Sequence, residues 1–541
     1  MKSLTIFLVV MIGVSALLHA QHIHDAKQLI ESERFASVEI LLEKYLTVNS
    51  PEPEVNYLLV KSYLEQDKTD EASKYVATHL LLAVNENADP LNRIAHARFL
   101  LNTGKKQEAE AIFTSLLTNK KTQKDPSLLL HMAEVAIEEE DGNAATALTW
   151  LDMAKKRDKR NAGIDLVRGL AYRKLGDATN AYLAYQEAIK NEPKYVRAYY
   201  LMGKIFTAQK NPEVYLEHFM NAYGIDSTYA PVLEELYNHY YHRDVKSAMK
   251  YLEKYIANTD YSVQNDYYMT DMLYLTGEYQ KAIESARAII SKEAGKAQPR
   301  LYKLIAYSYL KSGDSTAALQ HIKEYFAKED PARVIAADFE LIAQLTEKQP
   351  GHEEAAISYY TIAAEMDTIL INKAKYATAL AELYKKKEDH GNQAVWLGRL
   401  FQWKDRTNNV DLFNWGLAWY MAKDYRMTDS VFALYTDRYP ADVYGYYWRA
   451  LANASIDTAM TDSLALPFYL KVAEIGEKSK EANRKMLLKA YGYLGGYEAN
   501  ITKDYAASLA WFEKYNEMEE NADVSKYIET LRKWMAEKKI R

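Results

Sequence analysis

Apolar residues recur three and four positions apart along most of the chain, in short runs separated by polar stretches. Positions with this spacing lie on one face of an α-helix. The window from Asp165 to Pro193 shows the pattern clearly, with small and aromatic residues at Gly169, Tyr172, Ala181, Tyr185 and Ala188. Gly176-Asp177 interrupts the window, and Pro193 ends it. The window therefore predicts two amphipathic helices joined by a tight turn.

The same pattern returns along the chain. Gly203 follows Gly169 by 34 residues, and related windows are centred on Ala306 and Gly416. This spacing resembles the tetratricopeptide repeat, a helix–turn–helix unit of 34 residues. The resemblance implies an all-α fold, a right-handed superhelical solenoid of stacked hairpins, in which the first helix of each hairpin lines a concave groove.

We predict about fourteen such units. Their centres are Val60, Ala97, Ala133, Gly169, Gly203, Tyr237, Thr270, Ala306, Ala343, Leu380, Gly416, Ala450 and Ala490, preceded by a degenerate unit around Phe35 and Tyr45. Turn residues predict inserts at 138–143, 348–352, 389–392, 456–461 and 495–502. The solenoid would span residues 21–523, and an amphipathic helix over 524–541 would cap its last apolar face.

The first twenty residues have the three parts of a secretory signal peptide. A lysine at position 2 precedes a run from Leu4 to Leu18 without charge, and Ala20 ends the segment. We expect cleavage between Ala20 and Gln21; the alternative is an N-terminal membrane anchor, for which the run is slightly short. No later window is apolar enough to span a membrane, so the predicted location is the periplasm or the periplasmic face of the outer membrane.

Composition limits the chemistry. The 541 residues are 48% apolar and 26% charged, with 20 Gly, 12 Pro, 45 Tyr, no Cys and a net charge of −6. Few Gly and Pro favour helices over a sandwich or a barrel. The absence of cysteine excludes disulfides, thiolate metal sites and a cysteine nucleophile. The negative net charge does not indicate a surface that binds nucleic acid.

No catalytic constellation appears in the sequence. Phosphate-binding loops, zinc-helix motifs and nucleophile elbows are absent, so we predict a protein that is not an enzyme and needs no cofactor. An enzyme with an unrecognised site in an insert is a remote alternative. The histidines at 22 and 24 are expected in a flexible polar tail, and those at 239 and 242 lack a carboxylate to complete a metal site. The acidic run 138–141 is expected to be a solvated loop.

The 45 tyrosines suggest a binding surface. Tyrosine offers contact area, stiffness and a polar tip, although most of the 45 are expected to fill contacts between repeats. In the register of the resemblance, the candidate groove residues are Tyr200, Lys204, Asn238, Tyr241, Tyr267, Asp271, Tyr274, Lys303, Tyr307, Phe413, Tyr420 and Tyr447.

Six triplets of Asp followed by Ser or Thr resemble the O-glycosylation signal on exported proteins of one group of Gram-negative bacteria. The candidate acceptors are Ser227, Ser315, Thr368, Ser430, Thr458 and Ser463. Asp before Ser or Thr is also ordinary helix-capping chemistry, which repeats multiply.

These observations predict a periplasmic scaffold that binds another envelope protein, within an assembly, secretion or uptake machine. The alternative is a module that binds a glycan or peptidoglycan through the same aromatic groove. The sequence does not identify the partner.

Overall fold

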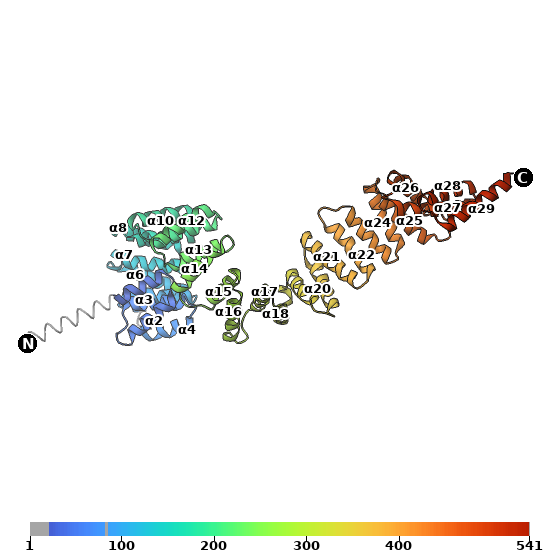
Figure 1. The fold of residues 1–541 in the computed structure, drawn as a ribbon. Coiled ribbons are helices and arrows are strands. Elements are labelled where there is room, and N and C mark those ends of the chain that lie inside the picture. The colour runs from blue at the N-terminus through green and yellow to red at the C-terminus, as the bar shows by residue number, and fades with distance from the viewer. Residues whose placement is uncertain (1–20, 82–84, 540–541) are drawn as a thin grey trace, which may run out of the picture. The chain divides into compact units, whose positions relative to one another are not determined.

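The computed structural model describes residues 21–81 and 85–539, and every regular element in that part of the chain is a helix. Contacts between residues divide the chain into two compact units, 1–297 and 298–541. Each unit is a stack of helical hairpins (Figure 1). The all-α fold of stacked helix pairs predicted from the periodicity is confirmed.

Unit 1 contains a helical stretch over residues 21–31 and the helices up to α16. Their bounds are α2 Phe35–Leu46, α3 Pro53–Leu64, α4 Thr69–His79, α5 Pro90–Asn102, α6 Lys106–Thr118, α7 Pro126–Glu138, α8 Ala144–Arg157, α9 Ala162–Lys174, α10 Ala178–Asn191, α11 Val196–Ala208, α12 Pro212–Ile225, α13 Ala230–Tyr240, α14 Val245–Asn258, α15 Val263–Leu275 and α16 Tyr279–Lys292.

Unit 2 contains the helices from α17 onward. Their bounds are α17 Arg300–Lys311, α18 Ser315–Lys328, α19 Ala336–Glu347, α20 Glu353–Met366, α21 Leu370–Lys386, α22 His390–Trp403, α23 Asn409–Met421, α24 Tyr425–Arg438, α25 Val443–Ile456, α26 Leu466–Gly476, α27 Arg484–Tyr497, α28 Tyr505–Met518 and α29 Ala522–Lys539. Short 3₁₀ turns (Thr122–Lys124, Pro331–Arg333, Glu477–Ser479) and a π turn (Glu498–Thr502) lie between helices.

The helices pair in chain order. The stretch 21–31 pairs with α2, and each later odd-numbered helix pairs with the next, which gives eight hairpins in the described part of unit 1 and six in unit 2. Helix α29 follows the last hairpin, where its Ile528 and Leu531 are buried and Trp534 contacts the ring of Tyr505. The fourteen units and the capping helix therefore agree with the periodicity.

A small residue of the first helix and a ring of the second hold several hairpins together. The pairs are Gly169 with Tyr185, Gly203 with Phe219, and Gly416 with Phe432, each 16 residues apart. A Cβ on any of these three glycines would lie within 2.5 Å of a ring atom. The helices can approach this closely only because the position has no side chain.

Many second helices start at an Asp or Asn whose side chain accepts a hydrogen bond from a backbone N–H of the first turn, as an N-cap does. These N-caps are Asn143, Asp177, Asn211, Asp244, Asp314, Asp389, Asp424 and Asp504. The turn residues that mark repeat boundaries in the sequence therefore also start the next helix.

The first described residues correct one expectation. Residues 21–31, predicted to begin with a flexible tail, form a helix in which Ala26 is fully buried and Ile23 packs against the first core cluster. The helix is the missing half of the degenerate first hairpin, and burial of its apolar face against α2 and α3 accounts for its order. The predicted signal peptide and Ala20 lie outside the described residues.

Candidate functional site

The predicted groove residues do not form one open stripe. Ten are half-buried: Tyr200, Lys204, Tyr241, Asp271, Tyr274, Lys303, Tyr307, Phe413, Tyr420 and Tyr447. Asn238 is exposed, whereas Tyr267 is 2% exposed and its hydroxyl donates a hydrogen bond to Glu293. The prediction that Tyr267 faces a partner is therefore wrong, because this position points into its own hairpin.

Tyr267 belongs to a recurring arrangement. Nine tyrosines in the described part of the chain are no more than 5% exposed and donate a hydroxyl hydrogen bond to a carboxylate: Tyr45 to Glu52, Tyr57 to Glu134, Tyr63 to Glu43, Tyr267 to Glu293, Tyr325 to Asp338, Tyr360 to Glu347, Tyr376 to Asp367, Tyr435 to Asp442 and Tyr491 to Glu477. A buried tyrosine fills the space between helices and satisfies its polar tip. Much of the tyrosine excess thus has a structural use.

Other predicted groove residues also form ion pairs or ring contacts with residues of the same chain. Lys204 pairs with Glu235, and Lys303 lies 2.9 Å from Asp338. The ring centroid of Phe413 lies 6.1 Å from that of Phe432, and the Tyr420 ring lies 5.0 Å from Trp448. Phe413 and Tyr420 therefore help to hold α23, α24 and α25 together.

A buried network of charges lies in unit 1. The side chain of Arg98 has no exposed surface, and its guanidinium contacts Glu138 at 2.7 Å and Glu139 at 3.4 Å. Lys61 contacts Glu138 at 2.7 Å, and the Tyr57 ring centroid lies 5.3 Å from the Arg98 guanidinium carbon. The prediction that 138–141 is a solvated loop is wrong for Glu138 and Glu139, because cations from α3 and α5 meet them as the hairpins stack.

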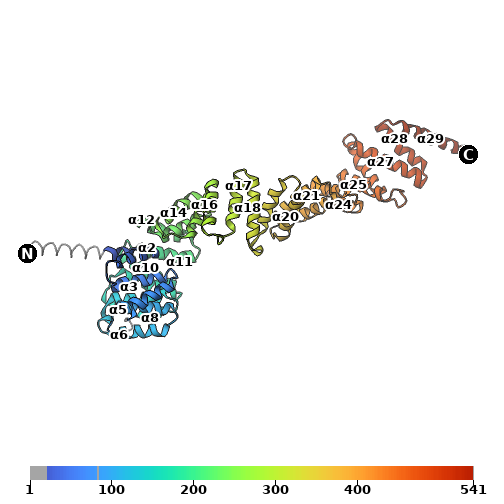
Figure 2. The ribbon, with the colours of Figure 1, turned by 90° about the horizontal axis from the view of Figure 1, so that it is seen from below.

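The first hairpin also meets the later part of unit 1. The Asp260 carboxylate, between α14 and α15, accepts hydrogen bonds from the backbone N–H groups of Ala36 (2.8 Å) and Ser37 (3.2 Å). Arg197 of α11 lies 3.5 Å from Glu31. We call these contacts the seam; Figure 2 labels α2 and α11 within unit 1. The seam thus joins the first hairpin to α11 and to the loop between α14 and α15.

Unit 2 retains an open pocket of about 560 Å³ between α25 and α27. It is lined by Tyr447, Ala454, Asp457, Thr458, Met460, Tyr469, Lys485, Leu488, Lys489, Gly492, Tyr493 and Tyr515. Helices α25 and α27 are the first helices of their hairpins, so the pocket lies on the side predicted to form the groove. Tyr447 is the predicted groove residue in this lining. We call this site the tyrosine pocket.

The tyrosine pocket combines aromatic walls with a basic rim. The Tyr469 and Tyr493 rings stack with centroids 4.4 Å apart, and Lys485 and Lys489 are exposed. The Tyr493 hydroxyl is buried without a hydrogen-bond partner, and burial, followed by the Asp457 charge, raises the pKa of Tyr493 to about 12. The site can therefore take an apolar or aromatic group next to a negative charge.

Sequence reasoning missed most of this pocket. Tyr493, Lys485 and Lys489 lie on α27, where the repeat pattern is weakest. Lys485, Lys489 and Gly492 are spaced by four and three residues, as one helix face requires. That spacing could have placed them beside Tyr447. The residues of α26 and α28 that complete the walls, Tyr469 and Tyr515, have no such signal.

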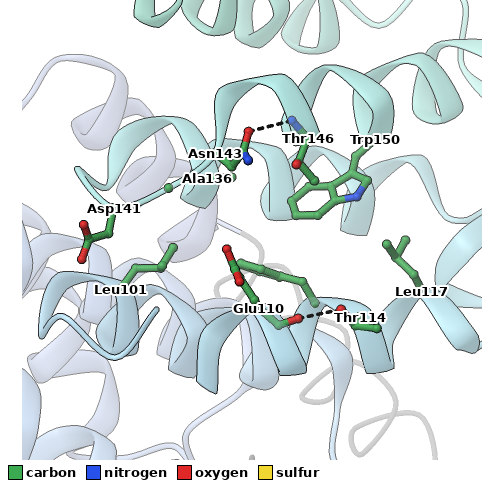
Figure 3. Close-up of a pocket in the computed structure, with 11 residues that line it drawn as sticks. Leu101, Glu110, Thr114, Leu117, Ala136, Asp141, Asn143, Thr146 and Trp150 are labelled. Carbon is green, nitrogen blue, oxygen red and sulfur yellow. Dashed lines mark hydrogen bonds between the residues drawn. The ribbon is translucent and has the colours of Figure 1, made fainter. Parts of the chain in front are cut away.

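A smaller cavity of about 240 Å³ lies between α6 and α8 (Figure 3). Phe113 and Trp150, whose ring centroids are 5.2 Å apart, form part of its wall, and the Glu110 carboxylate points into the space. Both helices are second helices of their hairpins. The cavity is therefore not part of the predicted groove.

The candidate glycosylation residues differ in access. Ser227, Thr368, Ser430 and Thr458 are exposed, whereas Ser315 and Ser463 are half-buried, and Ser463 shares a 2.6 Å hydrogen bond with Tyr497. Several of the preceding aspartates have structural roles: Asp314 caps α18, and Asp457 accepts hydrogen bonds from two backbone N–H groups of its loop. Glycosylation stays a prediction.

Among the residues that the structure describes, no three histidine or carboxylate side chains gather as metal ligands would. Within the same residues, no helix combines the length and apolar character needed to cross a membrane.

Comparison with known proteins agrees with the hairpin geometry. The family profile described as tetratricopeptide repeat matches residues 166–195, which contain the Gly169–Tyr185 contact. No curated protein matches the chain.

Three solved structures illustrate the similarity. The C-terminal part of a TPR repeat-containing protein from Cytophaga hutchinsonii is 24% identical over 48% of this chain and 97% of its own, with a TM-score of 0.30. A tetratricopeptide repeat protein from Parabacteroides merdae is 17% identical over 48% and 97%, with a TM-score of 0.29. A human IFIT1 dimer with m7Gppp-AAAA is 14% identical over 72% and 94%, with a TM-score of 0.34.

Tetratricopeptide repeats typically form non-catalytic scaffolds for protein–protein interaction. Residues 166–195 therefore match a tetratricopeptide repeat, and the glycine–ring contact of that repeat recurs between other paired helices of the chain.

Proposed function

We propose that the protein is an exported, non-enzymatic scaffold that holds another protein of the bacterial cell envelope, within an assembly, secretion or uptake machine. Export is inferred from the apolar run at 4–18 and the small residue at its end. The tyrosine pocket is the proposed contact with the partner, and it is the observation that carries the proposal.

The chemistry of the tyrosine pocket favours a protein segment over a sugar. Tyr469 and Tyr493 stack on each other, so each covers a ring face that a sugar would otherwise use. The rim lysines suit a carboxylate, and the walls suit an aromatic or apolar side chain. A segment with an acidic residue beside an aromatic one would satisfy both.

We expect Lys489→Glu and Tyr447→Ala each to weaken capture of the partner at least tenfold. The first places a negative charge at the rim, and the second removes an aromatic wall. The measurement is cross-linking of the exported protein in cells, followed by identification and quantitation of the linked proteins. Lys471→Glu is the matched control, because Lys471 is an exposed lysine of α26 outside the pocket lining. Equal capture by all variants would contradict the proposed site, and glycan-array binding without a protein partner would favour the glycan module.

We expect the exported protein to begin at Gln21. Sequencing of its N-terminus and measurement of its intact mass would show this, and retention of residues 1–20 would indicate a membrane anchor instead.

The same mass tests the candidate glycosylation residues. An unmodified mass would exclude glycosylation, whereas excess mass should disappear when the four exposed candidates, Ser227, Thr368, Ser430 and Thr458, are replaced by alanine.

A further inference from the structure

The two sides of the seam belong to different hydrophobic clusters. Val38 and Leu42 of the first hairpin pack into the cluster that continues into α3, whereas Tyr229 and Val196 belong to another. A cleft of about 970 Å³ lies between the two sides. The seam is thus a polar contact across a cleft, unlike the apolar stacking of neighbouring hairpins.

Several polar groups at the seam lack partners. One carboxylate oxygen of Glu31 and the hydroxyl of Tyr229 are buried without a hydrogen bond, and the Nε of Arg34, which also makes none, lies 3.7 Å from the Asp260 carboxylate. All three residues line the cleft. A buried polar group without a partner destabilises the conformation that buries it. Separation of the two sides would let water reach these groups.

Asp260 replaces a cap that the first hairpin lacks. The N-cap position of α2 is Arg34, whose side chain makes no capping hydrogen bond. Asp260 accepts hydrogen bonds from the N–H groups of Ala36 and Ser37, and also from the Ser37 hydroxyl. The Arg34 guanidinium lies 3.7 Å from the same carboxylate. One side chain therefore makes most of the polar contacts between this loop and the first hairpin.

The first hairpin faces a basic and aromatic side of α11: burial raises the pKa of Glu33, and the charges of Arg197 and Lys204 oppose that rise, while Lys204 also pairs with Glu235 of α13. Arg197, Tyr200 and Lys204 are spaced by three and four residues and share one side of the helix. Acidic residues of the first hairpin meet this side: Glu31 pairs with Arg197, and burial, followed by the nearby charge of Glu33, raises the pKa of Tyr200. Charges on the two sides are therefore complementary.

We propose that the α11 face formed by Arg197, Tyr200 and Lys204 is a second binding surface, which takes an acidic segment of a partner and which the first hairpin occupies until the seam opens. Opening bends the stack of hairpins and leaves the first hairpin packed on α3. This surface is independent of the tyrosine pocket, so either proposal can fail alone.

Opening can be measured directly because the chain has no cysteine. Spin labels at Lys44→Cys and Lys194→Cys place one label on each side of the cleft, at exposed positions. In the labelled protein without further changes, we expect a short distance to predominate. In Asp260→Ala, we expect the population of a longer distance to be about five times larger. Asp244→Ala, which removes the local N-cap of α14, is the matched control and should keep the short distance.

Binding is tested with a labelled hexaglutamate peptide, and hexalysine as the probe of opposite charge, at low ionic strength. We expect hexaglutamate to bind Asp260→Ala about fivefold more tightly than the unaltered protein, and Arg197→Gln in the Asp260→Ala protein to remove that gain. Arg197→Lys should restore part of it by restoring the charge. Circular dichroism and exchange of the amides in α3 check that the variants remain folded.

Each result supports or overturns the proposal. If Asp260→Ala keeps only the short distance, the seam does not open, and this would overturn the proposal that the first hairpin covers the surface reversibly. An opened seam without a gain in hexaglutamate binding, a gain that Arg197→Gln leaves intact, or equal binding of hexalysine would overturn the acidic-segment surface. Loss of the tyrosine-pocket contacts through Lys489→Glu should change none of these measurements.

Discussion

Replacement of Arg98 by methionine is expected to destabilise unit 1 by about 3–5 kcal/mol at pH 7. The Arg98 side chain is completely buried between Glu138 and Glu139, and methionine fills similar space without a charge. The two carboxylates would then remain in the interior with only Lys61 as a cationic partner. The loss comes from these uncompensated charges rather than from the pair as such.

Hydrogen exchange of the intact chain, followed by mass spectrometry, would measure this effect in the peptides of unit 1 separately from unit 2. Arg168→Met is the matched control, because Arg168 makes a more exposed ion pair with Asp152 at 2.6 Å. We expect that variant to lose no more than about 1 kcal/mol. Similar losses in the two variants would mean that burial of the Arg98 network is not what stabilises it.

The effect of Arg98→Met should depend on pH. Burial would raise the pKa of Glu138, but the charges of Lys61 and Arg98 outweigh it and hold that pKa well below its usual value. A lowered pKa contributes stability above the unfolded value of about 4.3 and loses it as the pH falls toward the folded value. Burial raises the pKa of Glu139, which acts in the opposite direction. The difference between the variant and the unaltered protein should therefore be largest near pH 7 and shrink below about pH 5.

Replacement of Gly416 by alanine is expected to destabilise unit 2 by about 1–3 kcal/mol. The added Cβ would lie 2.5 Å from a ring carbon of Phe432, and α23 and α24 would have to separate. Alanine is otherwise the better helix former, so a loss of stability shows that close packing outweighs helix propensity.

Gly496→Ala is the control for that prediction. Gly496 is in α27 of the same unit, and a Cβ there meets no atom within 4 Å. This variant should gain about 0.5–1 kcal/mol, because a helical glycine loses more conformational freedom on folding than alanine does. Thermal unfolding and exchange of α23 peptides would measure both changes. A gain in both variants would contradict the packing argument, and Phe432→Leu should recover part of the loss in Gly416→Ala.

The local spacing of apolar, small and turn residues predicted the hairpins well, because it depends on contacts between residues of one repeat. The 16-residue spacing between Gly169 and Tyr185 is such a contact, and so is the Asp that starts many second helices. Candidate sites were harder to predict because groove and core positions on one helix differ by a single residue. Tyr267 satisfies the same sequence pattern as Tyr447, yet it is buried within its hairpin whereas Tyr447 lines a pocket.

Apolar spacing, small residues and turn residues act over one repeat, so they were enough to predict the helical hairpins, their approximate number and the helix that follows them. Tertiary structure alone decided what lies across the stack. In the sequence, Glu138 and Glu139 belong to an acidic run that is typical of a solvated loop, whereas in the structure they form ion pairs with Arg98 and Lys61. Asp260 is a loop residue that nothing in the sequence connects to α2, yet it accepts a hydrogen bond from that helix. Tertiary packing brings together residues 40 to 224 positions apart in these contacts, and no local pattern encodes such a distance.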